Sequence, residues 1–177
     1  MLDVRSERLA RRFRLWDTDG NGHVDRSDFE NEGRRIVAAF GEDERSPRAR
    51  AVMDAYLAMW EYLATKAHVD PDGTLSAKQF DRVAQTEIIL MGDTGFSAVL
   101  RPTLSATLDL CDTDGDRQIN PVEFRNWIEA IGVTKPHAEE AFDQIDENHD
   151  GQLSIDELSQ AVRDYHAGIL DIPLLGR

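Results

Sequence analysis

Three stretches of this 177-residue chain repeat one twelve-residue pattern, D-x-[DN]-x-[DN], followed by an aliphatic residue and a closing acid. They are DTDGNGHVDRSD, DTDGDRQINPVE and DENHDGQLSIDE, which begin at Asp17, Asp112 and Asp146. A fourth stretch, HVDPDGTLSAKQ from His68 to Gln79, is a degraded copy that aligns on Gly73. Repetition of this kind predicts a chain built from copies of one supersecondary unit.

Apolar residues flank every loop at helical spacing. Phe13 and Trp16 precede the first loop, and an equivalent apolar side chain follows each loop, at Phe29, Phe80, Phe124 and Leu158. Residues three or four apart share one face of a helix, so each loop is predicted to join two amphipathic helices that pack in the core. A further helix is predicted between the first two loops, opened by the serine cap and proline of Ser46–Pro47.

The repeated positions are those that a hard cation needs. Calcium takes six to eight oxygen ligands, and a twelve-residue loop supplies them from positions 1, 3, 5, 7, 9 and 12. Acidic side chains gathered in this way repel one another unless a cation lies between them, which argues against three acidic turns without metal. The pattern therefore predicts three calcium ions. The predicted ligands, with position 7 contributing its backbone carbonyl, are Asp17, Asp19, Asn21, His23, Asp25 and Asp28 in the first loop, Asp112, Asp114, Asp116, Gln118, Asn120 and Glu123 in the third, and Asp146, Asn148, Asp150, Gln152, Ser154 and Glu157 in the fourth.

These loops make the chain resemble the EF-hand proteins. The stretches RRFRLWDTDGNGHVDRSDFE, CDTDGDRQINPVEF and AVRDYHAGILD make it similar to the calerythrin group of the sarcoplasmic calcium-binding type. The resemblance extends over nearly the whole chain. It implies a compact protein of four EF-hands, with three working sites and a degenerate second hand, of a kind regarded as an intracellular calcium buffer or signal modulator.

We predict an all-α fold in which the four EF-hands form two pairs packed into one compact globule. Residues 1–92 would hold the first pair, and residues 96–177 the second pair with a C-terminal tail. The GDTG stretch at Gly92–Gly95 is predicted to be the turn between them. The next helix is expected to begin near Pro102 or to kink there.

Position 8 of every loop is apolar, and paired loops are expected to form a short two-stranded β ladder at this position. A hand without a partner would expose that edge. The residues concerned are Val24, Leu75, Ile119 and Leu153.

The second loop is predicted to bind no calcium. His68 and Gln79 stand at positions 1 and 12, which leaves Asp70 and Asp72 as the only carboxylates. One histidine without a second His or Cys at ligand spacing is also a weak site for a softer metal. Because the turn glycine, the apolar position 8 and the helix cap remain, we interpret this hand as a structural partner of the first.

Two of the working loops depart from the usual pattern. Asp28, at position 12 of the first loop, is one methylene shorter than glutamate and reaches the ion less readily with both oxygens. Magnesium, which prefers six ligands in a tight octahedron, should therefore compete most at that site. Arg117 holds position 6 of the third loop, where glycine is expected because φ is positive. This strain, on the order of 1 kcal/mol, should weaken the third site.

The charge balance restricts the partners. Thirty-four acidic residues stand against 20 lysines and arginines, a formal net charge of −14, which repels nucleic acid and anionic membranes.

The start, MLDVRSERLARRF, has no apolar run suited to a signal peptide, and no apolar stretch is long enough to span a bilayer. Cys111 is the single cysteine, so no internal disulfide forms. We expect a cytoplasmic monomer with calcium ions as its ligands and no indicated target protein.

A calcium buffer is favoured over a sensor. A sensor exposes an apolar, often methionine-rich groove when calcium binds, whereas this chain has only four methionines. Its apolar tail, GILDIPLL, is expected either to fill a groove between the halves or to fray. A sensor that presents an apolar surface to a target protein remains the alternative. No enzyme is predicted, because the five histidines are dispersed and neither H-E-x-x-H nor G-x-S-x-G occurs.

Overall fold

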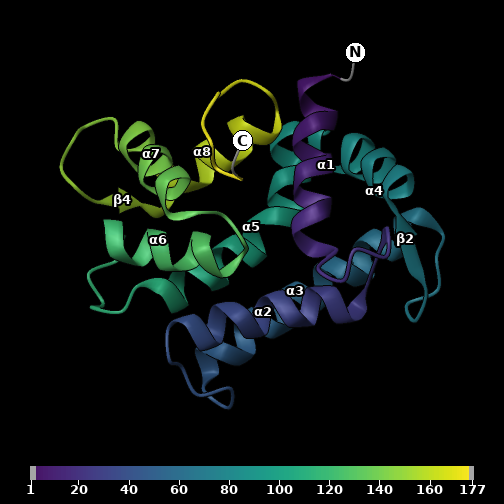
Figure 1. The fold of residues 1–177 in the computed structure, drawn as a ribbon, viewed down its shortest axis with the longest axis horizontal. Helices are drawn as coiled ribbons and strands as arrows, with labels where there is room; N and C mark the ends of the chain where they lie inside the picture. Colours follow the sequence, from purple (N-terminus) through teal and green to yellow (C-terminus); the bar gives the residue numbers. More distant parts are fainter. Residues whose placement is uncertain (1–2, 176–177) are drawn as a thin grey trace.

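The computed structural model describes residues 3–175 and is mainly helical (Figure 1). The α-helices are α1 (Val4–Trp16), α2 (Arg26–Ala39), α3 (Pro47–Ala67), α4 (Ala77–Ala84), α5 (Gly92–Cys111), α6 (Pro121–Ala130), α7 (Lys135–Ile145) and α8 (Ile155–His166). One π-helical turn, η1 (Gln85–Ile89), lies between α4 and α5. The short strands are β1 (His23–Asp25), β2 (Thr74–Ser76), β3 (Gln118–Ile119) and β4 (Leu153–Ser154).

Each helix that leaves a loop starts from a capping box. The cap side chain accepts a hydrogen bond from the backbone N–H three residues later, and the side chain at that later position accepts one from the N–H of the cap residue. This reciprocal pair satisfies two N–H groups that the helix cannot pair itself. The four caps are Asp25, Ser76, Asn120 and Ser154.

The loops pair as the sequence predicts. Strand β1 is antiparallel to β2, with Val24 opposite Leu75, and β3 is antiparallel to β4, with Ile119 opposite Leu153. All four side chains are at most 1% exposed, so each ladder carries its apolar position 8 into the core. The expected all-α architecture with two short ladders is therefore confirmed.

A continuous apolar core joins the two pairs of hands. Helix α5 packs against α3, and α6 packs against α2. In Figure 1, α1, α4 and β2 lie on one side of the molecule, whereas α6, α7 and β4 lie on the other. Among the fully buried side chains are Phe29 and Trp60 from the first pair and Phe124 from the second.

The GDTG stretch corrects one prediction. Gly92–Gly95 form the first turn of α5 and not a turn that separates the halves. Gly95 is buried, and a Cβ atom there would lie 2.5 Å from the carbonyl oxygens of both Glu87 and Ile88. This glycine is required because α5 and η1 approach each other closely. Helix α5 also begins well before Pro102 and continues past it, so the expected start near that proline is wrong.

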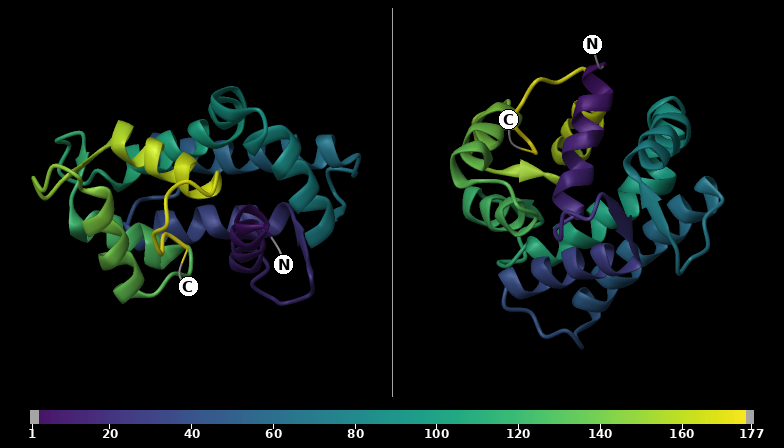
Figure 2. Two further views of the ribbon diagram at one scale, coloured as in Figure 1. Left: turned by 90° about the horizontal axis from the view of Figure 1, so that it is seen from above. Right: turned by 45° about the vertical axis from the view of Figure 1, so that its right-hand side comes forward.

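The C-terminal tail returns to the core after α8, and Figure 2 shows it running beside α1. Ile172, Leu174 and Leu175 are 3%, 3% and 6% exposed. Arg8 of α1 donates to the carbonyl of Tyr165 and lies 3.4 Å from the Asp171 carboxylate. The burial of these side chains supports the expectation that the tail packs between the two halves, and not the expectation that it frays.

No helix within residues 3–175 is both long and apolar enough to cross a lipid bilayer.

Candidate metal centres

The third loop gathers three carboxylates around one point. Asp112, Asp114 and Asp116 place carboxylate oxygens within 4.8 Å of one another. The hydrogen bond from the Asp116 N–H lowers the pKa of Asp114, but desolvation and the charges of Asp116 and Glu123 outweigh it, so that this pKa is raised. A divalent cation at the centre of the three carboxylates would relieve this repulsion.

The same set of hydrogen bonds fixes the backbone of all three predicted metal loops. The carboxylate at position 1 accepts from the backbone N–H at position 6, at 2.9 Å in the first and third loops and 3.0 Å in the fourth. The side chain at position 5 accepts from the N–H at position 7, at 2.8 to 2.9 Å. The oxygens predicted to bind the ion therefore also fix the backbone that carries them.

Positions 4 and 6 of these loops share a left-handed backbone. The φ angles at position 4 are 68°, 74° and 56° for Gly20, Gly115 and His149. At position 6, Arg117 has a positive φ of 65°, as the sequence predicts, and the glycines at this position of the first and fourth loops have φ angles of 81° and 80°. The backbone strain at His149, a non-glycine residue with a positive φ, was not predicted. The glycines at position 4 of the first and third loops were the signal that could have indicated it.

Arg117→Gly is expected to raise the calcium affinity of the third loop about fivefold, because it releases about 1 kcal/mol of backbone strain. Arg117→Met is the matched control, since it removes the positive charge but keeps the Cβ atom. Calorimetric titration of both variants checks the prediction. An equal gain in the methionine variant would assign the effect to charge and contradict the strain argument.

Two of the three closing acids at position 12, Glu123 and Asp28, are buried. Glu123 is 2% exposed and accepts from the N–H groups of Thr113 at 2.8 Å and Asn120 at 3.0 Å. Asp28 is 8% exposed and accepts from the Asp25 N–H at 2.9 Å. Desolvation is the main cause that raises the pKa of Asp28; the neighbouring loop carboxylates add to it, and the Asp25 hydrogen bond opposes it. Burial and the neighbouring carboxylates therefore disfavour its charged form, which a bound cation would stabilise.

Asp146, the first residue of the fourth loop, carries the clearest unsatisfied oxygen. Its side chain is 6% exposed, and Oδ2 accepts from the Gly151 N–H at 3.0 Å. Its Oδ1 atom is buried and has no hydrogen-bond partner among the described residues. A buried carboxylate oxygen without a partner is costly, and a bound cation would satisfy it. The donor set of this loop therefore fits a calcium ion.

The second loop is wound differently. His68, at position 1, has a left-handed φ of 58°, and position 4 is Pro71, which cannot adopt the positive φ of the other loops. The indole Nε1 of Trp60 donates to the Pro71 carbonyl at 2.9 Å. Gly73 has no positive φ, but a Cβ atom there would lie 2.8 Å from Val69. Glycine is required at this position because Val69 packs closely against it, and not because the loop makes the sharp turn of a metal site.

Two contacts between distant segments were not visible in the sequence. Gln152 Nε2 donates to Asp116 Oδ2 at 3.3 Å and joins the fourth loop to the third. Arg48 of α3 donates to the carbonyls of Asp109 at 3.1 Å and Asp112 at 3.2 Å. A guanidinium from the first pair of hands therefore holds the backbone where the third loop begins.

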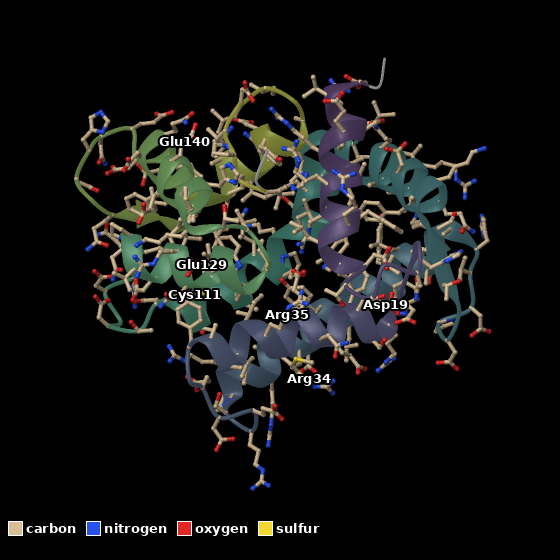
Figure 3. The ribbon with its side chains drawn as sticks, in the orientation of Figure 1. Asp19, Arg34, Arg35, Cys111, Glu129 and Glu140 are labelled. Atoms are coloured by element: carbon tan, nitrogen blue, oxygen red, sulfur yellow. The ribbon has the colours of Figure 1, made fainter. Side chains whose placement is uncertain are left out.

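Figure 3 places Asp19 in the loop that follows α1, and Cys111 at the end of α5. Cys111 is fully buried, and burial raises the pKa of its thiol well above the usual value. The thiol is therefore neutral and unsuited to metal binding or nucleophilic chemistry.

Comparison with known proteins places these loops in a family. A family model described as an EF-hand domain pair matches residues 101–163. Calerythrin of Saccharopolyspora erythraea is 44% identical over 173 residues, which cover 98% of both chains. A solved calcium-binding protein of Streptomyces coelicolor, described in terms of calcium-mediated regulation, matches with a TM-score of 0.78 and 32% identity over 92% of this chain and 98% of that one. Magnesium-loaded apo-berovin, a ctenophore photoprotein, shares the fold at a TM-score of 0.71 and 18% identity, over 90% of this chain and 86% of its own. The chain therefore belongs to the EF-hand calcium-binding proteins and, among them, to the calerythrin family.

Proposed function

We propose that this protein is an intracellular calcium buffer with three working sites. The ions would bind in the loops that begin at Asp17, Asp112 and Asp146, through the ligands predicted from the sequence. The hydrogen bonds that these loops share, the carboxylate cluster of the third and the unsatisfied oxygen of the fourth support this assignment.

The observation that favours a buffer is the C-terminal tail, which covers the space between the two halves. Leu174 and Leu175 of the tail line one cavity together with Trp127 and Ile128 of the second pair and Leu9 of the first. A sensor must present an apolar groove to its target when calcium binds. A tail that already covers this region favours ion binding without target binding.

The second hand is proposed to be structural. Its strand β2 pairs with β1, and Phe80 of α4 packs against Phe13 and Trp16 of the first hand, with ring centroids 5.8 and 5.6 Å apart. These contacts complete the fold of the first hand without requiring an ion.

A calorimetric calcium titration in a background of about 1 mM magnesium tests the proposal. A buffer should bind three ions with dissociation constants near 10⁻⁸ M that magnesium weakens, as in cytosolic EF-hand buffers. Cooperative binding near 10⁻⁶ M that ignores magnesium would contradict it. A stoichiometry of four would contradict the structural role of the second hand.

Magnesium competition should be strongest at the first site, because Asp28 is the short closing acid. Asp28→Glu is expected to raise the ratio of calcium to magnesium affinity at that site on the order of tenfold, the size of one charged contact. The reverse change in the fourth loop, Glu157→Asp, should lower the ratio there. Competition titrations that leave the ratio of the first site unchanged in Asp28→Glu would contradict the argument.

A calcium sensor is the second candidate, and the relative from Streptomyces coelicolor supports it, since that protein is described in terms of calcium-mediated regulation. The two functions differ in the surface that calcium exposes. Binding of a hydrophobic dye should change little between the magnesium and calcium forms of a buffer, whereas a large increase with calcium would favour the sensor.

We propose no catalytic role. The five histidines lie apart in the sequence, and the relatives matched are calcium-binding proteins. The net charge of −14 argues against nucleic acid or anionic membranes as partners.

A further inference from the structure

A cavity of about 100 Å³ lies between the two pairs of hands. Helices of both pairs contribute to its wall, and Leu174 and Leu175 of the tail complete it. The wall is mainly apolar and includes Met59, Leu104 and Ile128. The calcium loops do not line this cavity, so it is a feature separate from the metal centres.

Four buried polar atoms on residues of this wall lack a hydrogen-bond partner within residues 3–175. They are Nε1 of Trp16, Nε1 of Trp127, Oγ1 of Thr107 and Nδ1 of His166. Trp16 and Trp127 are only 3% and 7% exposed. Buried polar groups in native proteins are nearly always paired. Four such atoms on the wall of one cavity therefore indicate an occupant, which is either a ligand or ordered water.

The charged groups of the wall are already paired with one another. Glu32 is fully buried and accepts from Arg12 Nη1 at 3.1 Å and from the Tyr56 hydroxyl at 2.9 Å. Burial, with the charges of Arg12 and Arg8, lowers the pKa of His166 to about 3, so its imidazole is neutral. Among residues 3–175, the cavity therefore offers no unpaired charge to an ionic ligand. It offers two indole donors in apolar surroundings, which suit a neutral molecule with an acceptor atom.

We propose that this cavity binds a neutral aromatic molecule of about one ring that carries a hydrogen-bond acceptor, to which the indole N–H of Trp16 or Trp127 donates. The volume limits the ligand to one ring at most, since an apolar cavity of about 150 Å³ engineered in another protein binds benzene and this cavity is smaller.

Two probes of nearly equal shape test the proposal on the calcium-loaded full chain. Toluene has no acceptor, whereas γ-picoline replaces the ring carbon opposite the methyl group by nitrogen. Each is titrated at alkaline pH, where the picoline nitrogen is uncharged, while nitrogen–proton correlation NMR follows the indole signals of the three tryptophans. Trp60 is the internal control, because it does not line the cavity and its Nε1 already donates to Pro71.

We expect a saturable shift of the Trp16 or Trp127 signal with γ-picoline, and no shift of the Trp60 signal. Water hydrates the picoline nitrogen, so a cavity without a donor would bind toluene more tightly. With a donor, γ-picoline should bind at least as tightly as toluene. Replacing the tryptophan whose signal shifts by phenylalanine should weaken γ-picoline binding about tenfold and change toluene binding by less than about twofold.

Three results would overturn the proposal. The first is the absence of a saturable shift up to the solubility limit of both probes, which would leave water as the occupant. The second is tighter binding of toluene than of γ-picoline, and the third is an equal shift of the Trp60 signal. If the phenylalanine variant does not fold, the comparison of the two probes on the unaltered chain decides alone.

Discussion

Calcium removal by a chelator is expected to lower the Tm of this protein by at least about 25 °C. Each ion held at about a thousandfold above its dissociation constant stabilises the folded chain by about 4 kcal/mol, or about 12 kcal/mol for three ions. A chain of this length loses roughly 2 to 4 °C per kcal/mol. The chelated form also keeps the repulsion among Asp112, Asp114 and Asp116.

Thermal unfolding followed by circular dichroism, with calcium and with chelator, measures this effect. Asp146→Asn should reproduce part of the loss in calcium, because Asp146 supplies the first predicted ligand of the fourth loop. Asp156→Asn is the matched control, since Asp156 is exposed in the same loop at a position that supplies no ligand. A Tm that the chelator does not change would contradict calcium-dependent folding.

Conversion of the second loop into a calcium site is expected to need three substitutions. His68→Asp and Gln79→Glu restore the first and last ligands, but Pro71 holds φ near −65° at a position where the other loops have values of 56° to 74°. We therefore expect the double variant to bind three ions, and the triple variant with Pro71→Gly to bind four.

Calorimetric stoichiometry distinguishes these variants. Pro71→Gly alone is the control and should still bind three ions, because it adds no carboxylate. Its carbonyl can keep the hydrogen bond from Trp60, so the packing around the loop is retained. If the double variant binds a fourth ion, Pro71 does not prevent calcium binding. If the triple variant still binds three ions, the left-handed backbone at His68 also prevents binding at this site.

The conformation of the loops could be predicted from the sequence because the information for it is local. Ligand spacing, the apolar residue at position 8 and the cap at position 9 all lie within twelve residues. The structure has the predicted ladders at Val24 and Ile119, and Asn120 at position 9 of the third loop caps the helix that follows. The ligands, the number and identity of the ions and the order of the affinities stay predictions.

The structural features that the sequence did not predict depend on contacts between segments that are distant in the chain. Gly95 was interpreted as a turn residue, but its role is to let η1 approach α5, and both roles call for glycine in the sequence. Glu32 bonds to Arg12 and Tyr56, which lie 20 and 24 residues away. Such pairs form only once the helices are packed, so no local pattern indicated them.

The bonds from Arg48 to Asp109 and Asp112 limit how far the two halves can be treated as separate modules. Binding free energies are reciprocal: if α3 stabilises the filled third loop, then filling that loop stabilises the position of α3 by the same amount. A fragment of residues 96–177 lacks Arg48. Its affinities would therefore describe the fragment, and only the full chain can give those of the protein.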